Sequence, residues 1–322
     1  MITMKFVKLS RTSAWVAVGA ALVGLIAAVV HPDAPKVSIS TFIADSVLGD
    51  IAEYLTYAVG FFALFWFGLH RWMAARQLSR RRWPKLSQLS RELLFSLCSQ
   101  FIMLGVGTWI AFGDNAVAAN VYVDIGEYGW AYFGFLTFVL FAVDDTVFYW
   151  SHRAMHHPKL FEAFHRVHHE STDPTPFTAY SFHPLEAIVL TIGPLALTPL
   201  LIFLPWHPAA LIIYSVGNIL FNVIGHLGYE IYPAWWNRIP LLRWKTPAMH
   251  HYLHHQMVGG NYSLYFRWWD KICGTEFKDF EARYDRLFAA ASPQSSPDLD
   301  MISTHQRETS NAQNTEKDYY HA

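Results

Sequence analysis

Closely spaced histidines are the residues of this chain that are best suited to bind a metal ion. The 322-residue sequence contains 17 histidines, and 13 of them fall between His152 and His255. Three groups repeat a spacing of three or four residues, which places side chains on one face of a helix and lets them share a metal ion. These groups are His152-Arg-Ala-Met-His156, His165-Arg-Val-His168-His169 and His251-Tyr-Leu-His254-His255.

Together the groups predict a site for two metal ions. Two further candidates lie between them: His183, which precedes Pro184, and His226, at the end of an apolar segment. Ten imidazoles are more than one ion accepts, so two ions are implied. Imidazole binds zinc, iron, copper and nickel, so the ligand type does not by itself select the metal.

Two adjacent acids, Asp144 and Asp145, precede the first histidine group within an apolar run. An acid inside a membrane span is costly and is therefore a functional candidate. We expect these carboxylates to accept a hydrogen bond from the ring nitrogen of an imidazole that faces away from the metal, which fixes the ring tautomer.

Apolar runs predict the membrane spans that must position these groups. Hydrophobic residues make up 53% of the chain and charged residues only 15%, against roughly 25% charged in soluble domains. A helix needs about 20 apolar residues to cross the hydrocarbon core. Runs that approach this length lie at 13–30, 47–69, 93–112, about 129–149, 187–204 and 209–227.

Two of these runs leave alternatives open. The first, 13–30, could also be a cleaved signal peptide. The last two are separated by Pro205-Trp206-His207-Pro208, and they could be two full spans or a helical hairpin that dips into the membrane and returns. The predicted fold is all-α: a multi-pass transmembrane bundle of four spans, plus that hairpin or two further spans, with a helical cap.

Loop charges predict the orientation. The N-terminus and the loop from Arg71 to Lys85 are basic, whereas the loops at 31–46 and 113–128 hold a single lysine between them. Because basic loops remain in the cytoplasm, we expect the N-terminus, the cap and all histidine groups on the cytoplasmic side. The predicted parts are an N-terminal transmembrane region at 1–128, a catalytic domain at 129–288 and a disordered polar tail at 289–322.

From Asp144 to Thr275 the sequence resembles the fatty acid hydroxylase/sterol desaturase superfamily of membrane-bound diiron enzymes, and most closely its sterol desaturase branch. Beyond the histidine groups, the matching stretches are Tyr149-Trp150-Ser151-His152-Arg153, Pro174-Thr175-Pro176-Phe177, Phe182-His183-Pro184-Leu185-Glu186, Asn261-Tyr262-Ser263, Trp269-Asp270-Lys271 and Gly274-Thr275.

The resemblance implies a lipid hydroxylase or desaturase that uses two iron ions, O2 and electrons from a separate ferredoxin, cytochrome or reductase. Zinc could replace iron in a purified form. A second family H-x-x-x-H pair corresponds here to His226 and Glu230, so the carboxylate would coordinate a metal or support a ligand. Asn261 and Asp270 are further candidates for supporting roles. The metal ligands implied are His152, His156, His165, His168, His169, His183, His226, His251, His254 and His255.

Two rival functions follow from the same residues. A zinc-dependent membrane hydrolase would need fewer ligands than are present and has no H-E-x-x-H motif here. A membrane metal transporter would need histidines at mid-depth, whereas these lie at span ends. The net charge of −1 does not indicate a nucleic-acid partner, and the sequence leaves open the lipid substrate, the choice between hydroxylation and desaturation, and the oligomeric state.

Overall fold

The computed structural model describes residues 48–113 and 120–290. The predicted span at 13–30 lies outside these residues, as does the predicted tail after residue 290. All regular elements in the described ranges are helices, with only isolated β-bridges between them. The all-α prediction is therefore confirmed for this part of the chain.

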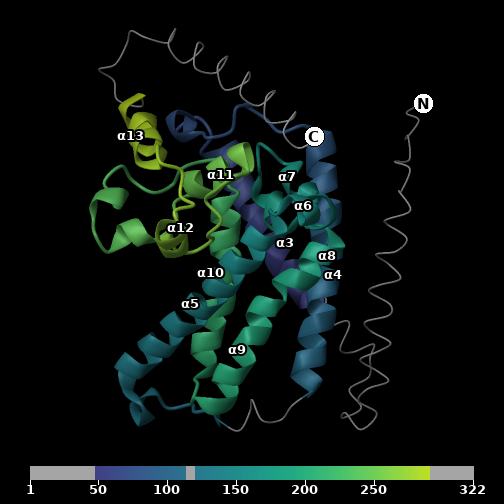
Figure 1. The fold of residues 1–322 in the computed structure, drawn as a ribbon, viewed down its shortest axis with the longest axis vertical. Coiled ribbons are helices and arrows are strands. Elements are labelled where there is room, and N and C mark those ends of the chain that lie inside the picture. The colour runs from purple at the N-terminus through teal and green to yellow at the C-terminus, as the bar shows by residue number, and fades with distance from the viewer. Residues whose placement is uncertain (1–47, 114–119, 291–322) are drawn as a thin grey trace, which may run out of the picture.

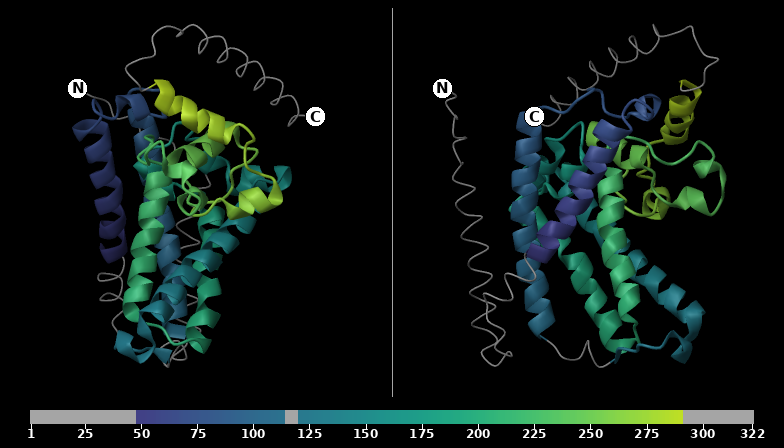
Figure 2. Two further views of the ribbon diagram at one scale, coloured as in Figure 1. Left: turned by 90° about the vertical axis from the view of Figure 1, so that its left-hand side faces the viewer. Right: turned by 180° about the vertical axis from the view of Figure 1, so that it is seen from behind.

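Long apolar helices form a bundle below a compact helical cap (Figures 1 and 2). Four helical stretches, Ile51–Gly68, Gly129–Met155, Pro184–Phe203 and Pro208–Gly225, are long and apolar enough to cross a membrane. A further helix, α4, covers the predicted span at 93–112. The bundle elements are α3 Leu48–Phe62 with η2 Ala63–Gly68, α4 Leu86–Gly113, α5 Gly129–Met155, α8 Pro184–Leu190, α9 Ile192–Phe203 and α10 Pro208–Gly225.

The turn between α9 and α10 lies at the end of the bundle far from the cap. Proline at the first position of α10 starts that helix, because its fixed φ suits a helix N-terminus. Trp206 in the turn exchanges backbone hydrogen bonds with Asn120 and Tyr122 at 2.9 and 3.0 Å, and Tyr132 donates to the Pro205 carbonyl at 2.8 Å. The turn therefore meets the start of α5, so α9 and α10 extend along the bundle as α5 does.

The cap gathers the short helices at the other end. It consists of α6 Pro158–Phe164, α7 Arg166–His169, η6 Pro176–Tyr180, η7 Trp236–Arg238, η8 Leu242–Trp244, α11 Ala248–Met257, α12 Trp268–Cys273 and α13 Phe280–Ala290. The segment after η2 packs against it, since the Arg80 amide donates to the Asp173 carboxylate at 3.0 Å. The basic loop and the histidine groups thus share one end of the molecule.

A buried acid of α4 ties the bundle to the cap. Glu92 is fully buried and accepts hydrogen bonds from the hydroxyls of Ser171 and Thr175 at 2.7 and 2.6 Å. Both hydroxyls belong to the loop that follows α7, and α7 carries two of the predicted ligands. An ionisable group in this position costs free energy unless it is paired, so Glu92 anchors the loop rather than merely filling space.

Candidate metal centre

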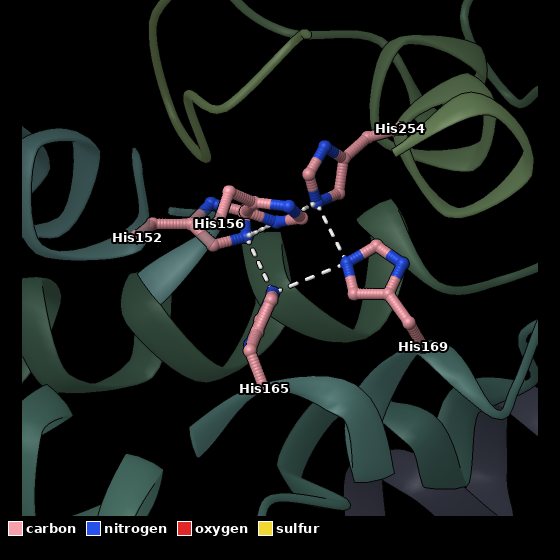
Figure 3. A group of neighbouring side chains, drawn as sticks. All are labelled: His152, His156, His165, His169 and His254. Atoms are coloured by element: carbon pink, nitrogen blue, oxygen red, sulfur yellow. Dashed lines mark hydrogen bonds between the residues drawn. The ribbon is translucent and has the colours of Figure 1, made fainter. Parts of the chain in front are cut away.

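Nine of the ten predicted ligands converge in two groups. The five-histidine group comprises His152, His156, His165, His169 and His254, and the four-histidine group comprises His168, His226, His251 and His255. In each group, one ring nitrogen per residue lies within 4.8 Å of the others. Figure 3 shows the five rings of the first group pointing toward one common centre.

Neighbouring residues on two helices divide between the groups. In α7, His168 and His169 belong to different groups, and in α11 the same is true of His254 and His255. Successive helical residues point about 100° apart, so one turn serves two centres. The groups lie side by side, because the rings of His169 and His255 stack with centroids 4.8 Å apart.

Short contacts between Nε2 atoms define the five-histidine group. The distances are 2.9 Å from His152 to His165, 3.1 Å from His165 to His169 and 3.0 Å from His169 to His254. Imidazoles at adjacent octahedral positions around an ion with metal–nitrogen bonds of about 2.1 Å have their nitrogens about 3 Å apart. The observed spacing is that of nitrogens sharing one ion.

The opposite ring nitrogens show that these contacts are not ordinary hydrogen bonds. Nδ1 of His152 donates to the Tyr262 carbonyl at 2.7 Å, and Nδ1 of His165 faces the Glu186 carboxylate at 2.6 Å. With the single proton of each neutral ring held at Nδ1, the two facing Nε2 atoms both present lone pairs. Lone pairs repel at 2.9 Å unless a cation lies between them, so the donor set fits a metal ion.

The four-histidine group shows the same short contacts between Nε2 atoms, but fewer of its outer ring nitrogens have a hydrogen-bond partner. Nε2 of His226 lies 2.9 Å from Nε2 of His251 and 3.3 Å from Nε2 of His168. Nδ1 of His226 donates to the Asn222 carbonyl at 2.7 Å. Among the described residues, Nδ1 of His251 and both ring nitrogens of His255 have no hydrogen-bond partner. Unpaired buried nitrogens are costly, and a bound ion would satisfy one on each ring.

Burial keeps these imidazoles neutral. Desolvation, and then repulsion from neighbouring histidines, lowers the pKa of His169, His254 and His255 well below the usual value. Burial also lowers the pKa of His226, to about 4, although the hydrogen bond to Asn222 opposes the shift. Neutral rings offer the lone pair that a metal requires, so the cluster is ready to bind cations at neutral pH.

Glu186 supports a ligand that sequence reasoning left without a partner. Both Glu186 and His165 are almost completely buried, and the carboxylate lies 2.6 Å from Nδ1 of the ring. A carboxylate on the outer nitrogen of a ligating histidine fixes its orientation and raises its basicity. The signal in the sequence was an acid in the otherwise apolar helix α8, which is unusual in a span.

The segment 260–263 orients two more ligands through its backbone. The carbonyls of Gly260 and Tyr262 accept from Nδ1 of His254 and His152, each at 2.7 Å. Asn261 stands between them with a φ of 56° and holds α11 by donating to the His250 carbonyl at 2.9 Å. A non-glycine residue in this conformation is uncommon, and here it directs two carbonyls at two rings.

Asp270 holds that segment from outside. Its carboxylate accepts from the amides of Tyr262 and Ser263 at 2.9 and 2.8 Å, and from the hydroxyl of Thr275 at 2.7 Å. Asp270 therefore acts on His152 through the backbone, one step further away than a carboxylate that touches the ring. The predicted supporting roles of Asn261 and Asp270 correspond to these contacts.

The hydrogen bonds of Asp144 and Asp145 differ from the expectation that they hold imidazoles. Asp144 accepts from the Tyr265 hydroxyl and Asn218 at 2.8 and 3.1 Å, and Asp145 accepts from the Tyr265 amide at 2.7 Å. Residues 144 and 145 lie about two turns before His152, too far along α5 to reach its ring. They instead fasten the stretch after residue 263 to α5.

Glu230 caps the helix that carries the third histidine group. Its carboxylate accepts from the amides of Tyr232 and Met249 at 2.9 and 2.8 Å, and Met249 is the second residue of α11. Burial raises the pKa of Glu230 to about 7, although these backbone hydrogen bonds oppose the shift. Since α11 follows Pro247, which has no side-chain cap, Glu230 supplies the missing acceptor and joins neither histidine group.

His183 is the one predicted ligand that the structure does not bring into either group. Its Nδ1 accepts from the Leu185 amide at 3.3 Å, so the ring caps the N-terminus of α8. The side chain is half-buried, whereas eight of the nine grouped histidines are fully buried. The position of His183 directly before Pro184 is that of a residue that caps the start of α8.

Known proteins resemble this chain over the segment that contains these histidines. Residues 137–275 match the family model described as fatty acid hydroxylase. The chain is 34% identical over 141 residues to a methylsterol monooxygenase of Aspergillus fumigatus, covering 43% of this chain and 47% of that protein. It is 31% identical over 158 residues to a Delta(7)-sterol 5(6)-desaturase of Gibberella zeae, covering 48% and 46%.

A third relative, methylsterol monooxygenase 1 of Rattus norvegicus, is 35% identical over 134 residues, covering 42% of this chain and 44% of that protein. The chain spans about half the length of the curated relatives it matches. No solved structure matches it. Residues 137–275 are therefore similar to the fatty acid hydroxylase family, and these relatives bear out the predicted likeness to the sterol desaturase branch.

Proposed function

We propose that this protein is a membrane-bound diiron oxidoreductase that uses O2 and external electrons to hydroxylate or desaturate a lipid, with a sterol as the first substrate class to test. The observation that carries the proposal is the convergence of nine buried imidazoles in two adjoining groups, on the segment that matches the family. Two bound iron ions would supply the activation of O2 and the removal of hydrogen from an unactivated C–H bond.

The chain's own residues prepare the site. The five-histidine and four-histidine groups would each hold one ion. Glu186 and the carbonyls of Gly260 and Tyr262 hold protons at the outer nitrogens, which leaves Nε2 free of a proton toward the metal. Burial of the rings excludes water, which would otherwise compete for reactive species.

The lipid composition of cells with and without the gene tests this function. We expect a lipid in the expressing cells that has gained one oxygen atom or lost two hydrogens. His168→Ala should abolish that product. His157→Asn is the matched control, since His157 adjoins the first group but caps α6 through Nδ1, and asparagine also caps helices.

Metal analysis with an oxygen electrode separates the rival functions. Iron with lipid-dependent O2 consumption supports the proposal, whereas zinc without O2 consumption would support a hydrolase. We also propose that electrons come from a separate ferredoxin, cytochrome or reductase. Turnover of the purified chain with NADH alone would contradict that part.

We further propose that the metal centre lies on the cytoplasmic side. The basic segment that contains Arg80 packs against the cap, while Asp124 and Glu127 lie beside the opposite turn. In a background without Cys98 and Cys273, an impermeant maleimide applied to intact cells should label Glu127→Cys. It should label Glu162→Cys only after lysis, and the reverse pattern would contradict this orientation.

A further inference from the structure

An apolar and basic projection extends sideways from the cap. It consists of residues 232–246, with η7 and η8, and residues 266–274, with α12; we call it the lateral lobe (Figure 1). The two segments are joined by the backbone hydrogen bond from Arg267 to Trp244 at 2.8 Å and by the isolated bridge between Lys245 and Phe266. It is therefore one structural unit.

Large apolar side chains cover the outside of the lobe. Leu241 is 82% exposed and Ile272 is 71% exposed, and Trp235, Ile239 and Trp244 are also exposed. Leaving such side chains in water forgoes the free energy that their burial would supply. Several exposed large apolar side chains on one lobe indicate contact with a membrane or a partner.

The charged residues of the lobe favour a membrane over a protein as its partner. Residues 232–246 contain no acidic residue. Arg238 is exposed and lies 3.6 Å from Asp285 of α13, and Lys271 lies 3.9 Å from Glu276. The guanidinium of Arg243 and the ammonium of Lys271 lie 5.8 and 5.5 Å from the Trp244 ring centroid. Tryptophan combined with arginine and lysine is typical of the membrane interface, where the ring sits among headgroups and the cations meet anionic lipids.

Contacts with α5 give the depth of the lobe. Phe266 and Trp268 pack on Phe138, with ring centroids 5.9 and 6.1 Å away, and Trp269 donates to the Thr146 hydroxyl at 3.0 Å. Phe138 lies 17 residues before the end of the candidate span Gly129–Met155, which is about 25 Å along the helix. A bilayer spanned by α5 therefore includes the surface on which the lobe rests.

We propose that the lateral lobe lies in the bilayer interface on the histidine side, with Leu241 and Ile272 immersed among the acyl chains and its basic residues at anionic headgroups. The surface continues the lipid-facing side of α5, so the occupant is the membrane itself. This inference does not depend on the metals or on the proposed reaction.

Nitroxide accessibility in lipid nanodiscs tests the proposal. In a background without Cys98 and Cys273, single labels are placed at Leu241→Cys and Ile272→Cys. The membrane control is Phe135→Cys, an exposed position of α5, and the aqueous control is Glu162→Cys, an exposed position of α6. Oxygen and a water-soluble nickel complex are the collision reagents.

We expect both lobe labels to show a high ratio of oxygen to nickel collisions, close to that at Phe135 and well above that at Glu162. A ratio equal to that at Glu162 overturns the proposal. So does shielding from both reagents with spin–spin broadening, because that result indicates a second chain on the lobe. The two positions are independent and exposed, so failure of one variant to fold leaves the other.

Discussion

The five-histidine and four-histidine groups differ in what surrounds them. In the larger group, His152, His165 and His254 each direct Nδ1 to an acceptor outside the group. In the smaller group His226 has such an acceptor, whereas His251 and His255 have none for Nδ1 among the described residues. The larger group also has one more ring.

This difference indicates unequal roles for two otherwise similar centres. Five rings leave fewer coordination positions open than four. Three of the five have an acceptor at Nδ1, while Nδ1 of His156 and His169 has none among the described residues, and oriented ligands bind a metal more tightly. We therefore expect the five-histidine group to retain its ion more strongly, and the four-histidine group to have more room for another ligand.

The largest effect should come from removing one ring from each group. His169→Ala leaves four rings in the larger group, and His255→Ala leaves three in the smaller one. The two side chains are buried and stack on each other, so they are matched for lost volume. We expect both variants to lose lipid product, but only His255→Ala to fall from about two metal ions per chain toward one, because three rings bind less well than four.

Metal analysis of the purified variants measures this difference. Equal metal loss in His169→Ala and His255→Ala would show that the two centres are equivalent and would refute the comparison. His157→Asn should retain the full metal content.

The next effect concerns the carboxylate behind His165. Glu186→Ala removes the acceptor 2.6 Å from Nδ1 and should weaken metal binding by about 10–100-fold, the usual result for a lost partner of a ligating histidine. Glu186→Gln keeps an acceptor oxygen and should weaken binding less. Competition with a chelator checks both variants, and a loss confined to the four-histidine group would contradict the assignment.

A smaller effect should reach both groups at once. Glu230→Ala removes the cap of α11, which typically costs about 0.5–2 kcal/mol. Because α11 gives His254 to one group and His251 and His255 to the other, both ions should be released more easily by the same factor. Chelator titration detects this, and selective loss of one ion would place Glu230 at a single centre.

The smallest effect on the metals should come from Glu276, which touches neither group. Burial raises its pKa, but the His250 ring 3.6 Å away and the hydrogen bond from Arg267 at 2.6 Å outweigh this and hold the pKa at about 2, below the usual 4.5. A depressed carboxyl pKa contributes stability above pH 4.5 that is lost as the pH falls toward 2. Glu276→Gln should therefore lower the melting temperature at pH 7 by about 2–4 °C per kcal/mol lost.

The pH series supplies the control for that prediction. The gap in melting temperature between the natural chain and Glu276→Gln should be constant above pH 4.5 and shrink below it. A gap that widens on acidification would mean that the carboxyl is not held ionised by its partners. Metal content at pH 7 should be unchanged.

Local spacing predicted eight of the nine converging histidines but not their grouping. The repeats around His165 and His251 identify helical faces, and apolar runs identify the spans, because both patterns depend on residues close in sequence. Which centre receives His168 or His169 depends on how α7 and α11 are rotated against each other, and no local pattern encodes that rotation.

The residues that hold the ligands in place were harder to predict from the sequence, because their partners lie far away along the chain. Glu186 reaches His165 across 21 residues and Glu92 reaches Ser171 across 79, so neither role is visible in a window of one helix. Asp144 and Asp145 were recognised as unusual acids, but their partner Tyr265 lies some 120 residues away. His183 was included because histidine before proline matches a motif, whereas its geometry is that of a helix cap.

The number of metal ions bound by the purified natural chain decides whether the two histidine groups form a two-ion centre. Elemental analysis of protein produced with ample iron should give two transition-metal ions per chain, held by the nine converging imidazoles. If the folded chain bound one ion or none, the proposal of a two-ion centre would be contradicted.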